Sequence, residues 1–439
     1  MKESFYNIFI DLEGKNETVI FNSLYGSMVL FNSEEKPMIK KYLQNPNFYR
    51  NEYIEILIKQ KMIIDNKVDE LDLVAVRKRR GVKDNNRLDL ILMPTLNCNF
   101  RCTYCFEEHI PSKMSEDMVE GVKKWLKEEI PKYKFLMIHW YGGEPLLADK
   151  TVYELSTFIS EQAKINNVLF TIHVTTNGYL INEKIARNFL AIGIADYQIT
   201  LDGPPDVHNE FRVLKGGRST FKRVFNKIIM LANIDRKIKI TLRINFNHNN
   251  INRIPELLNM FPEEIREQIR VVYEPIFGDC SISATSNICS SDISNNLSQY
   301  YELANRLGYD VALAMGSINT GKLVYCYAER ENQYIINFNG DCFKCSVSNF
   351  NPHERVGYID KNGNLTMEAD NYAKWISVDG FRNACNTCKY LPLCMGGCKR
   401  VREENSQSCS LISTNASYLL KQLALGYFDK LLQKEVDTL

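Results

Sequence analysis

The chain has 439 residues, and its 54 Lys and Arg nearly balance its 53 Asp and Glu, so no long-range field attracts nucleic acid or an anionic membrane. The N-terminus has no signal-peptide pattern and no apolar stretch is long enough to cross a bilayer, so we expect a cytoplasmic protein with no nucleic-acid or membrane partner. The 13 cysteines favour metal ligation over disulfides, because disulfide frameworks are typical of small secreted chains.

The first 80 residues contain no cysteine and show strand patterns followed by helical patterns. Two strands precede two helices, at residues 6–13, 18–31, 33–43 and 52–62. We therefore expect a small winged-helix module over residues 1–80. The basic stretch from Arg77 to Arg87 is interpreted as a solvated linker to the next domain.

From residue 88 to about 275, apolar runs of strand length alternate with amphipathic helical runs. The strand candidates are 88–94, 135–140, 169–175, 197–201, 238–244 and 271–274, and the helices between them include 115–130, 152–164 and 221–232. Repeated strand–helix units predict an α/β domain with a parallel sheet. Six such units favour an open, partial (β/α)6 TIM-like barrel over a closed eight-stranded one, and we assign it residues 81–314.

Beyond about residue 315 the hydrophobic periodicity weakens and cysteine becomes frequent. This change is expected where metal clusters replace part of a core. We assign residues 315–439 to a C-terminal cluster-binding domain that ends in a helix over residues 416–434.

Cys98, Cys102 and Cys105 form a C-x3-C-x2-C motif directly after the first strand of the predicted barrel, where active-site loops gather. Thiolates are the standard ligands of iron–sulfur clusters, and three of them leave one iron of a four-iron cubane open. The open iron can bind the amino and carboxylate groups of a methionine moiety. Short cysteine spacings also serve zinc, so from this motif alone a zinc site remains an alternative.

This spacing, with Tyr104 before the third cysteine, resembles the signature of the radical S-adenosylmethionine (SAM) superfamily, in which the aromatic residue lies against the adenine. The resemblance implies that one electron from the cluster splits SAM and releases a 5′-deoxyadenosyl radical. Four further strand ends carry residues similar to the SAM-binding segments of the family: Gly142, Gly143, Glu144 and Pro145; Thr176 and Asn177; Thr200 and Asp202; Arg243 and Asn245. Glu144 is expected to bind the ammonium of SAM. Arg243 and Asn245 would contact the carboxylate or ribose of SAM. For these two residues, a purely structural role as polar residues at a strand end is an equally favoured alternative.

Seven cysteines near the C-terminus resemble the SPASM domain, an extension of radical SAM enzymes that act on peptides and proteins. They are Cys326, Cys345, Cys385, Cys388, Cys394, Cys398 and Cys409. The resemblance implies two auxiliary [4Fe-4S] clusters, which makes three with the first. Cys385, Cys388, Cys394 and Cys409 would hold the outer cluster, and Cys326, Cys345 and Cys398 the inner one. A pair of zinc-ribbon-like sites is the alternative.

The inner set is one ligand short of the fully ligated family members. Either Cys342 supplies the fourth ligand, or the corner stays open for a substrate thiolate. Gly340 would supply the tight turn that brings Cys345 back towards Cys326. Cys280 and Cys289 are interpreted as buried or loop thiols.

The N-terminal module resembles the leader-peptide recognition elements of peptide maturases, which add an extended leader to an exposed sheet edge. Residues 21–31 would supply that edge. Packing on the barrel ranks second and DNA binding third, because the charge of residues 52–62 is mixed.

The resulting hypothesis is a radical SAM maturase that abstracts hydrogen from a ribosomal precursor peptide and installs a crosslink. A Cys thioether is favoured and a carbon–carbon link is a close second. An electron donor such as flavodoxin or ferredoxin is the second implied partner. Sulfatase-maturating oxidation of Cys or Ser, and a non-enzymatic iron–sulfur carrier, are the alternatives.

Overall fold

The protein divides into two compact units by its internal contacts. A computed structural model describes residues 1–12, 14–276, 297–311, 321, 323–347, 350–378, 381–400, 416, 419–426 and 428. Unit 1 comprises Met1–Val82, Ala314–Cys326 and Val378–Leu439, and unit 2 comprises Lys83–Leu313 and Tyr327–Ser377. Residues 327–377 belong to the same unit as the barrel segment, and the domain boundaries at residues 80 and 315 stay a prediction.

Unit 2 is built on a ten-stranded sheet of order β13-β12-β10-β9-β8-β6-β14-β15-β16-β17. The first six strands run parallel: β6 (Arg87–Leu92), β8 (Phe135–Trp140), β9 (Leu169–Thr176), β10 (Ile194–Thr200), β12 (Lys239–Phe246) and β13 (Ile269–Pro275). Each predicted strand overlaps one of these. The six-stranded parallel sheet of the predicted α/β fold is therefore confirmed.

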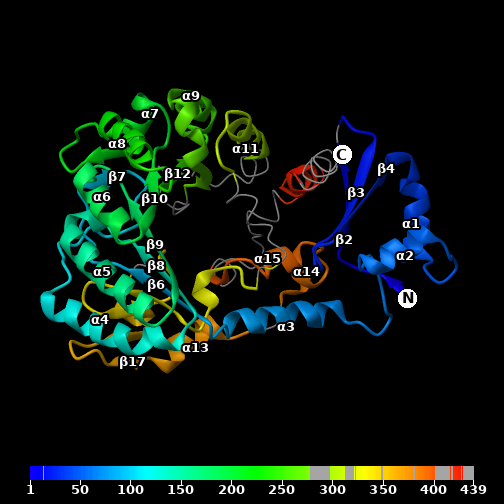
Figure 1. Ribbon diagram of the computed structural model, residues 1–439, viewed down its shortest axis with the longest axis horizontal. Coiled ribbons are helices and arrows are strands. Elements are labelled where there is room, and N and C mark those ends of the chain that lie inside the picture. The colour runs from blue at the N-terminus through cyan, green and yellow to red at the C-terminus, as the bar shows by residue number, and fades with distance from the viewer. Residues whose placement is uncertain are drawn as a thin grey trace. The chain divides into compact units, whose positions relative to one another are not determined.

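Helices cover one face of this sheet (Figure 1). The main ones are α4 (Glu116–Glu129), α5 (Asp149–Ile165), α6 (Glu183–Ala191) and α8 (Phe221–Ile234). In β8 the buried residues alternate, and Leu136, Ile138 and Trp140 enter the main hydrophobic core. The hydroxyl of Ser115 caps α4 by accepting the N–H of Met118 at 3.2 Å. Because the strands are parallel, the loops after them gather at one edge of the sheet.

Four short strands that the sequence did not predict extend this sheet. They are β14 (Gln333–Ile336), β15 (Asp341–Phe343), β16 (Gly357–Ile359) and β17 (Leu365–Met367). β14 pairs in parallel with β6, and the later pairs are antiparallel. Part of the predicted C-terminal cluster domain therefore belongs to the barrel sheet.

Unit 1 begins with a three-stranded antiparallel sheet of order β2-β3-β4 (Figure 1). Its elements are β2 (Asn7–Leu12), β3 (Glu17–Asn22), β4 (Met28–Asn32), α1 (Lys36–Gln44) and α2 (Glu52–Lys59). β1 (Lys2–Glu3) pairs with β5 (Ile63–Ile64). The predicted order of two strand segments and two helices is present, and the winged-helix assignment stays a prediction.

Two expectations for this module need correction. Residues 77–82 are not a solvated linker but the end of helix α3 (Glu70–Val82), because Val74 and Lys78 on its inner face are buried. The proposed edge at 21–31 is also too wide, since Phe21 lies in the central strand β3 and is fully buried. Within residues 21–31 only β4 lies at an edge of this sheet, whose other edge strand is β2.

No helix among the described residues combines the length and apolar character needed to cross a bilayer.

Candidate functional site

Cys98, Cys102 and Cys105 lie in the loop that follows β6, at the carboxyl edge of the parallel strands. Cys98 is buried, Cys102 half-buried and Cys105 exposed. The loop is held locally, because β7 (Phe100–Cys102) pairs with β11 (Arg212–Leu214) and the N–H of Cys105 donates to the carbonyl of Cys102 at 3.2 Å. The predicted ligands of the first cluster therefore share one compact loop.

The chemistry of this loop fits an iron–sulfur cluster. Burial raises the pKa of the Cys98 thiol to about 12, and such a thiol ionises when a bound cation compensates its charge. Within the described residues, no three Cys, His, Asp or Glu side chains surround a point where one metal ion would fit. In a four-iron cubane each thiolate of the loop would ligate its own iron.

Two glycines let the loop after β8 approach the loop that precedes the first cysteine. The N–H of Gly143 donates to the carbonyl oxygen of Thr95 at 3.2 Å. A Cβ on Gly143 would lie 2.4 Å from the carbonyl oxygen of Asn97. One on Gly142, whose φ is +112°, would lie 2.4 Å from that of Thr95. Only glycine permits this contact between the two loops.

Glu144 is fully buried, and its carboxylate joins two strand ends. Oε1 accepts the N–H of Leu146 at 2.9 Å and the hydroxyl of Thr176 at 2.8 Å, and Oε2 accepts the N–H of Asn177 at 2.7 Å. Burial raises the pKa of Glu144 to about 6, against the opposite effect of these donors. Glu144 also caps the short 3-10 helix Pro145–Ala148. The carboxylate is charged at neutral pH and held in one orientation, as a partner for an ammonium must be.

Three residues predicted from separate motifs meet in one hydrogen-bonded cluster, in which Asp202 and Asn245 are buried and Tyr104 is half-buried. The hydroxyl of Tyr104 donates to Asp202 Oδ2 and accepts from Asn245 Nδ2 at 3.0 Å. The backbone N–H of Asn245 donates to Asp202 Oδ1 at 3.0 Å. Burial raises the pKa of both the Tyr104 hydroxyl and the Asp202 carboxyl.

Arg212 completes this cluster, and sequence reasoning missed it. Its Nη1 donates to the hydroxyl of Tyr104 at 2.7 Å. Burial acts to lower its pKa, but the nearby charges of Cys102, Tyr104 and Asp202 outweigh burial and raise it. The short helix α7 (Pro205–Phe211) separates Arg212 from Asp202 in the chain. The pairing of β11 with β7, which brings Arg212 to the cysteine loop, leaves no periodicity in the sequence.

The remaining predicted residues lie at the same edge of the sheet. Asn177 Nδ2 donates to Asn99 Oδ1 at 2.7 Å and lies 3.9 Å from Cys98 Sγ. Arg243 Nε donates to Asn245 Oδ1 at 2.9 Å, and Thr200 is the cross-strand partner of Arg243. The structure thus brings the predicted strand-end motifs together around the first cysteine loop.

The C-terminal cysteines are placed only in part. Six of the seven cysteines that resemble the SPASM motif lie in the described part and are half-buried: Cys326, Cys345, Cys385, Cys388, Cys394 and Cys398. Cys280, Cys289 and Cys409 lie outside the described residues. None of the described cysteines forms a disulfide. Gly340 has a φ of +88° and occupies the predicted turn, between β14 and β15.

Cys342 differs from the other cysteines of this region. It lies on β15 with no exposed surface, among Ile336, Val356 and Ile359 of the hydrophobic core. Its thiol donates to the carbonyl oxygen of Gly340 at 3.5 Å. This environment is that of a core residue, and the ligand role of Cys342 stays a prediction.

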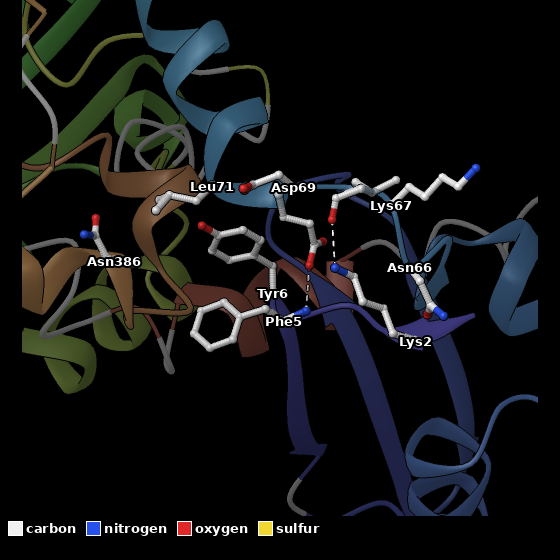
Figure 2. Close-up of a pocket in the computed structure, with 10 residues that line it drawn as sticks. Lys2, Phe5, Tyr6, Asn66, Lys67, Asp69, Leu71 and Asn386 are labelled. Carbon is white, nitrogen blue, oxygen red and sulfur yellow. Dashed lines mark hydrogen bonds between the residues drawn. The ribbon is translucent and has the colours of Figure 1, made fainter.

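A cavity of about 410 Å³ opens in unit 1. Its lining comprises Lys2, Phe5, Tyr6, residues 66–71 and Asn386 (Figure 2). None of these residues was predicted to bind SAM. The cavity lies where β1 and the start of α3 meet the segment between Cys385 and Cys388.

Comparison with known proteins identifies relatives that share most of the chain. The chain is 25% identical over 347 residues to the cysteine-type anaerobic sulfatase-maturating enzyme of Clostridium novyi (strain NT), covering 72% of this chain and 89% of that protein. It is 24% identical over 345 residues to the enzyme of the same name from Clostridium perfringens (strain 13 / Type A), covering 73% and 91%.

Solved structures share the fold. Native anSMEcpe with bound AdoMet and Kp18Cys peptide aligns with a TM-score of 0.59 and 18% identity, covering 77% of this chain and 97% of that chain. Streptococcus suis SuiB bound to precursor peptide SuiA aligns with a TM-score of 0.50 and 15% identity, covering 92% and 97%. Residues 92–261 match the Radical SAM superfamily. These residues form a radical SAM domain, and the prediction that the chain is a radical SAM enzyme is confirmed.

Proposed function

We propose that this enzyme acts on a ribosomal precursor peptide and joins two of its residues, with a thioether from a substrate cysteine as the favoured link. The relatives support a peptide or protein substrate, since SuiB is bound to a precursor peptide and anSMEcpe to a peptide. A carbon–carbon link remains the second choice. A flavodoxin or ferredoxin as electron donor, and three [4Fe-4S] clusters in all, belong to the same proposal.

Bound SAM supplies the radical that removes hydrogen from the substrate. The chain's own residues hold and orient it. Cys98, Cys102 and Cys105 would ligate the first cluster, and the carboxylate of Glu144 would pair with the ammonium of SAM. Hydrogen bonds from Arg212 and Asn245 and to Asp202 hold the hydroxyl of Tyr104, the residue that precedes Cys105, in one orientation.

The observation that carries the thioether proposal is the burial of Cys342. Its thiol has no exposed surface and donates to Gly340 within its own hairpin. Since a strand alternates its side chains, Phe343 enters a different hydrophobic cluster on the other face. Without Cys342 the inner set is Cys326, Cys345 and Cys398, which leaves one iron corner for a substrate thiolate.

The register of β4 supports leader binding at this strand. The N–H of Asn22 donates to the carbonyl of Ser27 at 2.9 Å. In an antiparallel pair the hydrogen-bonded positions alternate, so Val29 bonds to β3 while Leu30 directs its N–H and C=O away from β3. An extended peptide would pair with these outward groups.

The test is anaerobic incubation of the reconstituted enzyme with SAM, a reductant and a leader-containing peptide. The expected product has lost two hydrogens per link, and its cysteine no longer reacts with iodoacetamide. The matched control is the same peptide with its cysteine replaced by Ala, which should remain unchanged. Formation of 5′-deoxyadenosine with an unaltered peptide would contradict the proposal.

A second candidate function is oxidation of a substrate Cys or Ser, which the similarity to the sulfatase-maturating enzymes favours. Such oxidation joins no residues, so protease digestion of the product gives separate linear fragments. A crosslinked product instead releases two fragments that stay joined. Tandem mass spectrometry of the digest therefore distinguishes the two functions.

A further inference from the structure

We propose that Lys78, in the N-terminal module, is a positioning residue for the auxiliary iron–sulfur clusters. It holds the segment between Cys394 and Cys398 and places a positive charge beside it. This role rests on the proposed function, in which Cys394 is a ligand of the outer cluster and Cys398 of the inner one. All the contacts involved lie within unit 1.

Lys78 is an unusual lysine because its side chain is 3% exposed. Its ammonium donates to the carbonyl oxygen of Met395 at 3.1 Å and lies 5.5 Å from the ring centroid of Phe381. The neighbouring Arg79 and Arg80 on α3 are exposed. The buried position is therefore specific to Lys78 and directed at the cysteine segment.

The segment that Lys78 contacts has an unusual backbone conformation. Met395, Gly396 and Gly397 all have positive φ, at 51°, 91° and 76°. Glycine adopts this region readily, but Met395 needs support from its surroundings. The N–H of Met395 donates to the carbonyl of Leu391 at 2.7 Å, and Lys78 binds its carbonyl on the opposite side of the residue. Both backbone groups of Met395 are thus fixed, which sets the spacing of the two flanking cysteines.

Further contacts make the N-terminal module and the cysteine segment one packed body. Ser23 Oγ donates to the carbonyl of Lys389 at 2.5 Å, and Lys389 Nζ donates to the carbonyl of Asn7 at 2.8 Å. A hydrophobic cluster joins the two parts, with Tyr6, Leu24, Val74, Leu391 and Met395 buried in it and Cys385 and Cys388 packed against it. In Figure 2 the side chains of Tyr6 and Leu71, which line the cavity, are directed toward Asn386.

The charge of Lys78 has an electrostatic consequence. Reduction adds one electron to a cluster, and a nearby positive charge stabilises the reduced form. In a buried environment such an interaction is stronger than in water. Lys78 should therefore raise the reduction potential of an auxiliary cluster held by the adjacent cysteines.

The test uses the full chain with Cys98→Ala, Cys102→Ala and Cys105→Ala, so that only the auxiliary clusters remain. In this background Lys78→Met is compared with Arg79→Met, which removes the same charge from an exposed position on the same helix. Iron per chain, the EPR spectrum of the reduced clusters and their midpoint potential are measured after anaerobic reconstitution.

Lys78→Met is expected to change the EPR spectrum and shift a midpoint potential to a more negative value, while Arg79→Met changes neither. If Lys78→Met does not fold, Lys78→Gln keeps an N–H donor without the charge and should still lower the potential. A spectrum and potential equal to those of the parent would overturn the role of Lys78. A parent without iron would instead overturn the proposed auxiliary clusters, and this role with them.

Discussion

Glu144 is fully buried and accepts hydrogen bonds from three neighbouring groups. Burial raises the pKa of its carboxyl, and the hydrogen bonds lower it. Burial raises the pKa to about 6, from the ordinary 4.5 of a glutamate. The group is therefore largely charged at pH 7 and becomes neutral as the pH falls through 6. Its neighbours Leu146, Thr176 and Asn177 donate hydrogen bonds to the carboxylate.

We expect SAM affinity to fall as the pH drops below about 6, because the protonated Glu144 no longer attracts an ammonium. Glu144→Gln should weaken SAM binding about tenfold or more at pH 7.5, roughly 1.4 kcal/mol, and should remove the pH dependence between pH 5 and 7.5. Equilibrium dialysis of SAM against the reconstituted protein measures both effects. An unchanged pH profile in the variant would contradict the role assigned to Glu144.

The backbone around Gly143 leaves no space for a side chain at this position. In Gly143→Ala the new Cβ would meet the carbonyl oxygens of Asn97 and Leu96 at 2.4 and 2.5 Å, so the cysteine loop must shift. We expect a loss of about 1–3 kcal/mol in stability and reduced iron at the first cluster. Gly216→Ala is the control, since nothing lies within 4 Å of a Cβ there. Urea unfolding and iron analysis compare the two variants.

Much of the candidate site could be predicted at the residue scale, because its residues occur in short motifs at the ends of long strands. Tyr104, Asp202 and Asn245 were all identified in this way, and the structure brings them together. Arg212 could not be predicted, because it reaches the site through a three-residue strand pair that leaves no pattern in the sequence. Isolated charged residues after a short helix are usually solvated.

At the scale of elements, strand β15 gives Cys342 and Cys345 different environments. Cys342 points into the core, whereas Cys345 lies just beyond the strand and is half-buried. We expect Cys342→Ala to keep its full iron content and to lose about 1 kcal/mol of stability. Cys345→Ala should lose iron. Iron analysis of both variants in the background without the first cluster tests this, and loss of iron from Cys342→Ala would restore it as a ligand.

The edge strand β4 gives a second prediction. Leu30→Pro removes an N–H that points away from β3, so the module should stay folded while leader affinity falls about fivefold, the value of one backbone hydrogen bond of about 1 kcal/mol. Val29→Pro removes a bond to β3 instead and should destabilise the sheet. Fluorescence anisotropy with a labelled leader peptide measures binding. Equal affinity for Leu30→Pro and the parent would place the leader elsewhere.

The long strands were predicted from the sequence, whereas the short ones were not. The six parallel strands have six to eight residues each and were all found, because an apolar run of that length is distinctive. The strands β14 to β17 have three or four residues and were missed. The segment 77–82 was misjudged because its exposed arginines hide the buried Val74 and Lys78 on the other side of the helix.

At the scale of the whole molecule, unit 1 is assembled from three separate stretches of the chain. Deletion of residues 1–80 should therefore do more than abolish leader binding. It removes Tyr6, Leu24, Val74 and Lys78 from the side of the cysteine segment, so we expect loss of auxiliary-cluster iron as well. Iron analysis in the background without the first cluster tests this expectation, and full retention of iron would show that the cysteine segment folds without the module.

The discontinuity of unit 1 also bears on biosynthesis. The N-terminal 82 residues leave the ribosome long before residues 381–400, yet the partner of Lys78 lies among the latter. Until residues 381–400 have been made, the inner face of α3 lacks the contacts that bury it, and Lys78 lacks its partner Met395. Unit 1 can therefore complete its packing around α3 only after synthesis has passed residue 400.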